Sequence, residues 1–444
     1  MFSVFFGLLF RVCSAFIITH FCPMRIRSRS KPNRFQVLLA PWQDMDHTLL
    51  FLTIALTFLG GIMIRSTELT ERLTDWWQHW LTGSVGLILV LMLARFRYEN
   101  LLRGQWIVYG VTCASLLAVR FVGTEALGAQ RWISIGSFHI QPSEFAKLGA
   151  IIVLAASLST HTASSLSGVA RAALIISVPW ALVFIQPDLG TSLVFGAIML
   201  PMLYWANANP GWLLILGSPL ISAILFYYSL PTWLAWVFLM GVIAWKTLPW
   251  SQVSGLVVTV GNLLAGGLGN WFWFKLLKEY QRDRLILFMD PDKDPLGGGY
   301  HLIQSRIAIG AGELWGRGLH HGTQTQLSFI PEQHTDFIFS AIGEELGFVG
   351  SCLTLLLYWL VCLRLVIVAQ NAKDNFGSLL AIGVLGMIVF QMIVNVGMNI
   401  GLAPVTGIPL PWISYGRSAL LTNFIAIGLV ESVANHRHRS KNVF

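Results

Sequence analysis

Residues 189–245 read LGTSLVFGAIMLPMLYWANANPGWLLILGSPLISAILFYYSLPTWLAWVFLMGVIAW, and this run of 57 residues contains no Asp, Glu, Lys or Arg. A helix of about 20 apolar residues crosses the hydrocarbon core of a bilayer. The run is therefore too long for one or two crossings. Turn sequences at residues 209–211 (Asn-Pro-Gly) and 230–231 (Leu-Pro) divide it. It predicts three spans, near Thr191–Trp205, Trp212–Tyr228 and Trp233–Trp245.

The rest of the chain has a similar composition. Of the 444 residues, 55% are hydrophobic and 11% are charged, whereas an ordinary soluble domain carries about 25% charged residues. The apolar runs are continuous rather than alternating, so the spans are helices and not barrel strands. The sequence predicts an all-α polytopic membrane protein with further spans near Thr48–Ile64, Trp76–Ala94, Trp106–Val122, Glu144–Leu158, Ala172–Gln186, Val253–Phe274, Asp336–Ile367, Leu379–Ile400 and Ser418–Val433.

Basic residues predict the orientation, because cytoplasmic loops next to membrane helices are enriched in Lys and Arg. They cluster at residues 25–34, 95–103 and 437–441, and twelve spans place all three clusters on the cytoplasmic side. We expect residues 1–45 to be a basic N-terminal extension, cytoplasmic or partly anchoring. Residues 46–435 then form the membrane domain, and residues 436–444 form a basic cytoplasmic tail.

Charged residues concentrate in one segment. Lys275–Glu345 holds 17 of the 50 charged residues of the chain, and span parity places it outside as a large loop. Long loops within compact proteins are usually functional. Three other polar clusters are predicted on the same face, within Gly128–Lys147, at residues 186–188 and within Gly401–Arg417. Four external segments should therefore converge on one surface.

Glu144 and Lys147 begin a predicted helix at positions i and i+3, so their side chains can meet on one face. Ionisable groups at the edge of a membrane rarely stand alone. A structural ion pair is the simpler interpretation. The alternative is that Lys147 or Arg131 faces an anionic ligand.

Long motifs in these segments resemble the SEDS family (shape, elongation, division and sporulation). They are Gly128–Lys147, Gln186–Leu193, Tyr280–Phe339, Gln391–Met398 and Gly401–Leu420. Within Tyr280–Phe339, the stretches DPDKDPLGGGYHLIQS (290–305) and GTQTQLSFIPEQHTDFIF (322–339) resemble the elongation, rod-shape members more than the division members. The resemblance covers nearly all of the chain from about Asp46 to Val433.

This resemblance implies a bundle of about ten core spans and a peptidoglycan glycosyltransferase that polymerises lipid II during cell-wall elongation. The implied partners are a class B penicillin-binding transpeptidase, other elongation-complex proteins and membrane lipid, with no nucleic acid. Two features depart from the family: the extra hairpin at Trp212–Trp245, and Arg417, where a second Gly is usual. With Arg417 in this position, the family pattern does not predict the local geometry of the loop.

Asp294 matches the essential aspartate of the family, so the resemblance implies that it is the general base. In the proposed reaction a sugar hydroxyl attacks the anomeric carbon of a second lipid-linked disaccharide, and a carboxylate must accept the proton. The Pro-Leu-Gly-Gly-Gly sequence that follows can turn sharply. Without the resemblance, solvation or turn formation would be the usual role of such an aspartate.

The diphosphate that leaves requires positive charge, for which Arg131, Lys147, Arg306 and Arg317 are candidates. A divalent cation, Mg or Mn, near Asp290 and Asp294 is conceivable, but no dedicated metal site is predicted. His301 and His334 fit loop hydrogen bonds better than metal ligation, and Asp188 fits a helix cap or a functional carboxylate. The candidate substrate-binding residues are Arg131, Trp132, Glu144, Lys147, Asp188, Gln304, Ser305, Arg306 and His334.

Two other functions compete with the glycosyltransferase. Gln391, Asn395 and Asn399 share one helical stripe, which could line a path for flipping a lipid-linked precursor or simply make hydrogen bonds between helices. The crowding of charge in the external segment argues against a transporter. A scaffold without catalysis is the third possibility. We also expect the helix of the transpeptidase to pack on Gly383, Gly386 and Gly397, with packing inside the bundle as the alternative.

Overall fold

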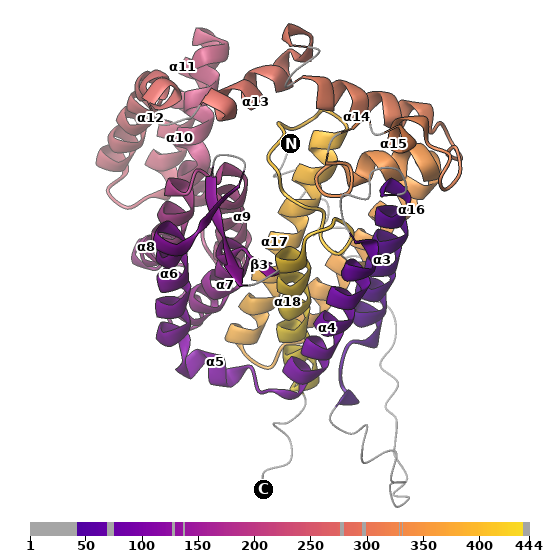
Figure 1. Cartoon of the computed structure of the whole chain (residues 1–444). Helices are drawn as coiled ribbons and strands as arrows, with labels where there is room; N and C mark the ends of the chain where they lie inside the picture. Colours follow the sequence, from indigo (N-terminus) through magenta and orange to yellow (C-terminus); the bar gives the residue numbers. More distant parts are fainter. Residues whose placement is uncertain are drawn as a thin grey trace, which may run out of the picture. The chain divides into compact units, whose positions relative to one another are not determined.

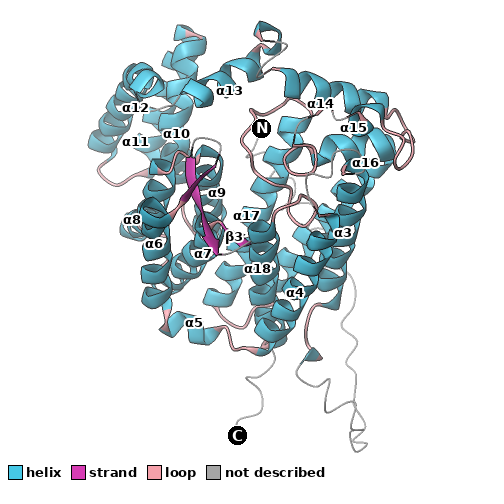
Figure 2. Ribbon diagram, in the orientation of Figure 1, coloured by secondary structure: helices cyan, strands magenta, loops and turns pink. Residues whose placement is uncertain are grey.

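The computed structural model describes residues 42–68, 75–126, 129–135, 138–275, 279–294, 299–327, 329–330 and 332–437. Most of the predicted N-terminal extension, residues 1–45, lies outside them, as does most of the basic tail. In the described part, eleven helices are long and apolar enough to cross a membrane, and α9 (Leu189–Trp205) is a shorter apolar helix. These helices confirm the all-α polytopic fold and the extra hairpin, and an apolar helix lies at each of the twelve predicted spans (Figures 1 and 2).

Apolar helices make up most of the described part of the chain. They are α3 (His47–Thr67), α4 (Trp76–Arg95), α6 (Gln105–Val122), α7 (Pro142–Thr160), α8 (Leu166–Ile185), α9 (Leu189–Trp205), α10 (Pro210–Tyr228), α11 (Leu230–Thr247), α12 (Ser251–Lys275), α16 (Ile338–Gln370), α17 (Asn375–Asn399) and α18 (Arg417–Asn435). The other elements are α5 (Glu99–Arg103), β1 (Thr124–Ala126), β2 (Ala129–Ile135), β3 (Phe138–Ile140), α13 (Glu279–Met289), η2 (Pro291–Lys293), α14 (Tyr300–Ala311) and α15 (Thr323–Gln326).

Small residues allow the central helices to approach closely. A Cβ atom at Gly86 of α4 would lie 2.4 Å from the ring of Phe424, so α4 and α18 pack against each other along their lengths (Figure 1). Gly383 of α17 faces Ile151 of α7, and Gly386 faces Pro201 of α9. Both glycines are therefore used inside the bundle. The prediction that they form the docking face for a partner helix was wrong, and internal packing is the correct interpretation.

The helices α10, α11 and α12 form a second group that packs mainly on itself. A buried polar network joins them: Trp233 Nε1 donates to Ser222 Oγ over 2.8 Å, and Asn262 Nδ2 donates to Ser218 Oγ over 3.0 Å. Ser222 Oγ also donates to the backbone oxygen of Asn262 over 2.7 Å. Hydrogen bonds therefore hold together a group that buries few of its apolar side chains.

The charged segment 275–345, predicted as a large external loop, contains several helices. It contains α13, η2, α14 and α15, and its last residues belong to α16. Helix α16 breaks at Gly347, where φ is 68° and ψ is −164°. A Cβ atom there would lie 2.2 Å from the backbone nitrogen of Gly316, so only glycine fits. Residues 338–346 form a short buried helix before the membrane crossing.

A small antiparallel sheet, in the order β1-β2-β3, joins α6 to α7 and was not predicted. Figure 2 shows its strands beside these helices. Ile133 pairs with Ile140, and Ile135 pairs with Phe138. Alternation over a few residues is a weak signal next to long apolar runs, so these strands are hard to recognise from the sequence alone.

Polar contacts gather at two opposite ends of the helices. At the first end, which we call the site face, the backbone nitrogen of Gln141 donates to Ser418 Oγ over 3.1 Å, and Gln333 Nε2 donates to the oxygen of Thr67 over 3.0 Å. At the second end, the far face, Arg364 Nε donates to Asp46 Oδ2 over 2.9 Å. The site face therefore contains the starts of α7 and α18 and the end of α3.

Candidate active site

The chain between α17 and α18 forms the floor of the site face. Ile408, Trp412 and Ile413 are buried, although connecting segments usually run over the surface. Buried backbone oxygens need hydrogen-bond donors. Asn395 Nδ2 donates to the oxygen of Ile408 over 2.9 Å, and the Tyr358 hydroxyl donates to the oxygen of Pro411. This segment is therefore fixed by side chains from the helices around it.

Asp336 lies against this floor, two residues before α16. A Cβ atom at Gly407, where φ is 75°, would lie 3.5 Å from Asp336 Oδ2 and 4.0 Å from Arg284 Nη1. These distances leave room for a Cβ atom, but the left-handed backbone conformation at this position favours glycine. Burial raises the pKa of Asp336 to about 6, the nearby Arg284 opposes the rise, and Glu332 adds to it. The sequence marked Asp336 only as the start of a predicted span.

The polar stripe of α17 supports the floor. Asn395 Nδ2 and Asn399 Nδ2 each donate to the backbone oxygen of Asp336 over 3.0 Å. Asn399 Oδ1 also accepts from the backbone nitrogen of Ser340 over 3.0 Å. Asn399 therefore makes a hydrogen bond between helices, as predicted, whereas Asn395 bonds to the connecting segments at Asp336 and Ile408. Gln391 is buried, and its amide atoms have no hydrogen-bond partner among the described residues.

Arg131 and Asp188 meet at one corner of the site face. Arg131, on β2 beside Trp132, donates to the backbone oxygen of Pro187, and its Nη1 lies 4.0 Å from Asp188 Oδ1. Asp188 caps α9, since its Oδ1 accepts from the nitrogen of Thr191 over 3.2 Å. Gln141 Nε2 reaches the other carboxylate oxygen of Asp188 over 3.4 Å. The sheet therefore brings a guanidinium to the start of a helix, where positive backbone partial charge also lies.

Glu144 and Lys147 form the predicted ion pair. Lys147 Nζ donates to Glu144 Oε2 over 2.7 Å, and the two side chains are 4% and 1% exposed. The pair is thus enclosed by α7 and its neighbours. Water cannot solvate these two buried charges, so each charge is stabilised by the other.

Asp294 lies where η2 ends, and its residue is exposed. The nitrogen of Gly299 donates to the backbone oxygen of Asp294 over 3.0 Å. A Cβ atom at Gly299 would lie 2.2 Å from the oxygen of Pro291, so glycine is needed to close this turn. Asp290 Oδ2 lies 3.7 Å from Lys293 Nζ in the same segment.

Helix α14 carries Gln304, Ser305 and Arg306. Ser305 is fully buried, and its hydroxyl donates to the backbone oxygen of Asn399 over 2.7 Å. Gln304 is half-buried. Arg306 is exposed and donates through Nη2 to the oxygen of Gly401 over 3.2 Å. The Ser305 contact anchors α14, and the Arg306 contact places a guanidinium at the end of α17.

His301 and His334, two of the four histidines of the charged segment, pack against aromatic rings. His334 is buried with its Nδ1 3.3 Å from Glu68 Oε1, and its ring packs edge-on against Tyr415. The ring of His301 stacks on Phe337, and burial together with Arg284 lowers its pKa. For His334 this agrees with a role in holding the loop. Among the described residues, no group of three His, Cys, Asp or Glu side chains could hold a metal ion.

Arg417 begins α18 and donates to the side-chain oxygen of Gln78, which also accepts from the Tyr415 hydroxyl over 3.1 Å. Arg417 therefore ties the floor of the site to α4. The structure brings Arg131 to Asp188, Glu144 to Lys147, and Ser305 to the end of α17. Asp294 lies on the exposed segment between α13 and α14.

Comparisons with known proteins identify the family. The sequence model of the cell cycle protein family of FtsW, RodA and SpoVE matches residues 46–235 and 230–439. Peptidoglycan glycosyltransferase RodA of Treponema pallidum is 34% identical over 425 residues, covering 88% of this chain and 97% of the relative. Peptidoglycan glycosyltransferase MrdB of Escherichia coli is 35% identical over 401 residues, covering 88% and 94%.

A solved structure shares the fold. It comes from a study of how a peptidoglycan synthase complex coordinates polymerization and crosslinking, and the matching chain is 29% identical. The TM-score is 0.65, and the match covers 90% of this chain and 100% of that one. The chain therefore belongs to the SEDS family of FtsW, RodA and SpoVE.

Proposed function

We propose that this chain is a peptidoglycan glycosyltransferase that polymerises lipid II at the site face during cell-wall elongation, with Asp294 as the general base. Support comes from the relatives that carry the name peptidoglycan glycosyltransferase and match nearly their full length. The observation that carries the proposal is the anchoring of the segment around Asp294.

That segment is held at both ends. Before Asp294, Gln281 Nε2 of α13 donates to the backbone oxygen of Pro187 over 3.3 Å, the same atom that accepts from Arg131. After Asp294, Ser305 bonds to the end of α17. Figure 1 shows α13 and α14 following each other along this side of the bundle. The exposed carboxylate thus lies on a segment fixed to two polar corners.

The chemistry requires a base and a binding site for the leaving group. A carboxylate within hydrogen-bond reach of the attacking hydroxyl contributes about 10²–10⁴-fold, and Asp294 is accessible to a bulky sugar. Guanidinium groups bind phosphate oxygens through pairs of N–H donors. Arg306 is exposed and uses only one nitrogen for its bond to Gly401. It is our first candidate for the diphosphate, with Arg131 as the second.

A divalent cation, Mg²⁺ or Mn²⁺, remains a prediction. Mg²⁺ is commonly held by one or two carboxylates together with substrate phosphates. Asp290 could contribute one carboxylate, although its ion pair with Lys293 would have to open. Polymerisation measured with and without a chelator tests this requirement.

The partner we propose is a class B penicillin-binding transpeptidase within the elongation complex. A chain composed mainly of membrane helices can extend glycan but presents no motif of a peptide-crosslinking nucleophile. The structural neighbour from a peptidoglycan synthase complex supports this pairing.

We place the site face outside the bacterial cytoplasmic membrane, because the basic clusters favour the far face for the cytoplasm. Leu327, in the charged segment, is 63% exposed near the end of α3, whereas its neighbour Ser328 lies outside the described residues. In a cysteine-free background, Leu327→Cys should react with an impermeant maleimide in intact spheroplasts. Ser164→Cys, between α7 and α8, should react only after permeabilisation, and the reverse pattern would invert the orientation.

Flipping of the lipid-linked precursor has less support. The side-chain amides of Asn395 and Asn399 donate hydrogen bonds to backbone oxygens. These residues therefore do not offer a continuous polar path. The deciding experiment supplies lipid II to the purified chain together with its transpeptidase and separates the products by length. We expect polymer from the wild-type chain. If no polymer forms and fluorescent lipid II moves across the liposome membrane, the chain is a transporter and not a glycosyltransferase.

A further inference from the structure

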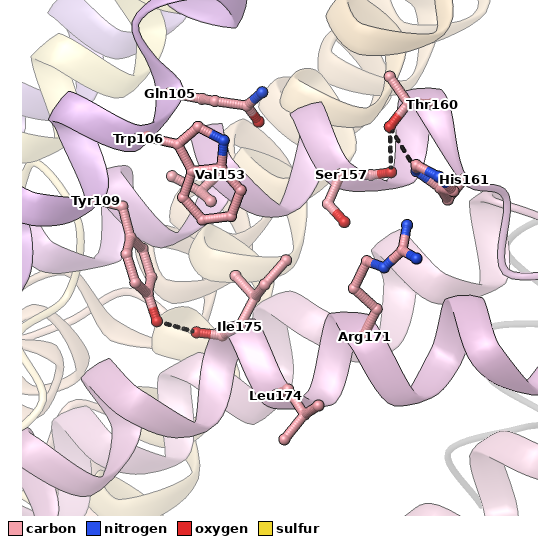
Figure 3. Close-up of a pocket in the computed structure, with 10 residues that line it drawn as sticks. All are labelled: Gln105, Trp106, Tyr109, Val153, Ser157, Thr160, His161, Arg171, Leu174 and Ile175. Atoms are coloured by element: carbon pink, nitrogen blue, oxygen red, sulfur yellow. Dashed lines mark hydrogen bonds between the residues drawn. The ribbon is translucent and has the colours of Figure 1, made fainter.

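A pocket of about 580 Å³ lies between α6, α7 and α8, away from the site face. The first turns of α6 contribute Gln105 and Trp106, the end of α7 contributes Ser157 and Thr160, and α8 contributes Arg171 (Figure 3). Gln186, at the other end of α8, bonds to the oxygen of Leu116 in the last turns of α6. The pocket is therefore at the far face, near the level where these helices leave the bilayer.

One side of the pocket is polar. Figure 3 shows the guanidinium of Arg171 directed toward Ser157 and His161. The Thr160 hydroxyl lies 2.9 Å from His161 Nδ1 and donates to the backbone oxygen of Ser157 over 3.0 Å. A cation, hydroxyls and an imidazole thus share one corner, which suits a phosphate group.

The charge of this corner is uncompensated by carboxylates. Arg171 makes no ion pair or hydrogen bond among the residues that the structure describes. Helices α6, α7 and α8 contain a single acidic residue, Glu144. It is paired with Lys147 at the site face. An anion that enters the pocket therefore displaces no carboxylate from Arg171.

The other side of the pocket is apolar and faces outward from the bundle. Trp106 is 63% exposed and Leu174 is 70% exposed. Tryptophan is enriched where membrane helices meet the interface. The Tyr109 hydroxyl donates to the backbone oxygen of Ile175 over 2.9 Å and fixes α6 to α8 across the pocket. A fixed cavity with a cationic corner and an apolar wall matches an amphiphile with a negative head.

We infer that this pocket binds the headgroup of an anionic phospholipid, with its phosphate on Arg171 and its acyl chains along Trp106 and Leu174. Basic pockets between membrane helices on the cytoplasmic side are suited to such headgroups, and the volume is that of an ordinary small-molecule site. The binding is independent of glycan polymerisation. Only its assignment to the cytoplasmic leaflet depends on the orientation proposed above.

The test is lipid retention by the delipidated full-length protein, measured by native mass spectrometry. Phosphatidylglycerol is compared with phosphatidylcholine of the same acyl chains. A basic residue near an anionic headgroup contributes about 1 kcal/mol, which is about fivefold in affinity. Arg171→Gln should therefore lower phosphatidylglycerol affinity about fivefold and lower phosphatidylcholine affinity by less, because the choline cation offsets its phosphate charge. Arg171→Lys should retain most of the preference.

The matched control is Arg95→Gln, which removes an exposed arginine from the last turn of α4 outside the pocket. Equal losses from Arg95→Gln and Arg171→Gln would mean diffuse attraction and would overturn the proposal. So would equal retention of both lipids by the wild-type protein, or displacement of phosphatidylglycerol by millimolar inorganic phosphate. Should Arg171→Gln fail to fold, Ser157→Leu fills the pocket without a change of charge. It should weaken phosphatidylglycerol binding, and unchanged affinity would also overturn the inference.

Discussion

Helices α7 and α11 have the same mean hydropathy, yet their surroundings differ greatly. In its most apolar window, 78% of α7 is buried inside the protein, compared with 28% of α11. The same contrast separates α17 and α18, at 67% and 83%, from α10 and α12, at 11% and 17%. Hydropathy therefore identifies which segments enter the membrane. It does not tell which of them form the centre, because lipid and protein interior are equally apolar.

The two groups also differ in the polar groups they bury. The central helices enclose an ion pair and supply the amides that hold the floor of the site. The α10–α12 group encloses only neutral hydroxyl, indole and amide groups among the described residues. Burying charge is costly unless it is paired. The central group therefore combines the tightest packing with the most demanding electrostatics, and the following changes test that difference.

The largest effect is expected at Asp294, on the segment between the two groups. Asp294→Asn should lower glycan polymerisation at least about 100-fold while the protein still accumulates in the membrane, since an amide cannot accept the proton. Asp283→Asn, on the exposed side of α13, is the matched control and should retain activity. Polymer from Asp294→Asn at the wild-type rate would eliminate Asp294 as the base.

The next effect concerns the ion pair of α7. Removing either Glu144 or Lys147 leaves a buried charge alone, which costs about 3–5 kcal/mol. The charge-swapped double variant should be more stable than either single variant, as thermal unfolding in detergent can measure. Independent, additive losses would show that the two side chains are not coupled in solution.

A smaller effect distinguishes glycines of the two groups. Gly383→Leu places side-chain atoms where Ile151 and Met202 lie 2.7 and 2.9 Å from the Cβ position, and such overpacking costs about 1–3 kcal/mol. No atom of the described residues lies within 4 Å of the Cβ position at Gly267 of α12. Gly267→Leu should keep or raise the melting temperature, because leucine favours a helix more than glycine does. Equal losses would mean that the outer group is also tightly packed.

The smallest effect is a pH dependence at Asp336. Its pKa is about 6 instead of 3.8, so between pH 4 and 6 the folded protein keeps a proton that the unfolded chain releases. This carboxyl therefore contributes stability at low pH that is lost as pH rises through 6. The difference in melting temperature between Asp336→Asn and wild type (variant minus wild type) should increase from pH 4 to 6 and then stay constant. A flat difference would mean that Asp336 titrates normally, and Asp283→Asn provides the comparison.

Some features of the site could be predicted from neighbouring residues alone. Glu144 and Lys147 are one helical turn apart, and Asp188 follows Pro at the start of an apolar run, so the ion pair and the cap both follow from local geometry. The contact of Arg131 with Pro187 is different, because it joins residues 56 positions apart through a sheet that was not predicted. Asp336 likewise acquires its raised pKa from burial, a property of the folded chain that no local pattern contains.

For the described part of the chain, the sequence by itself determined the number and order of the long apolar helices, because each is a local run of apolar residues with its own turn signals. It also determined the family, through long motifs such as residues 290–305. Only the tertiary structure decided that Gly383 and Gly386 face α7 and α9, that α16 breaks at Gly347, and that the floor of the site is buried. These features depend on which surfaces meet. When helices have equal hydropathy, their local sequences do not show which of them pack against each other.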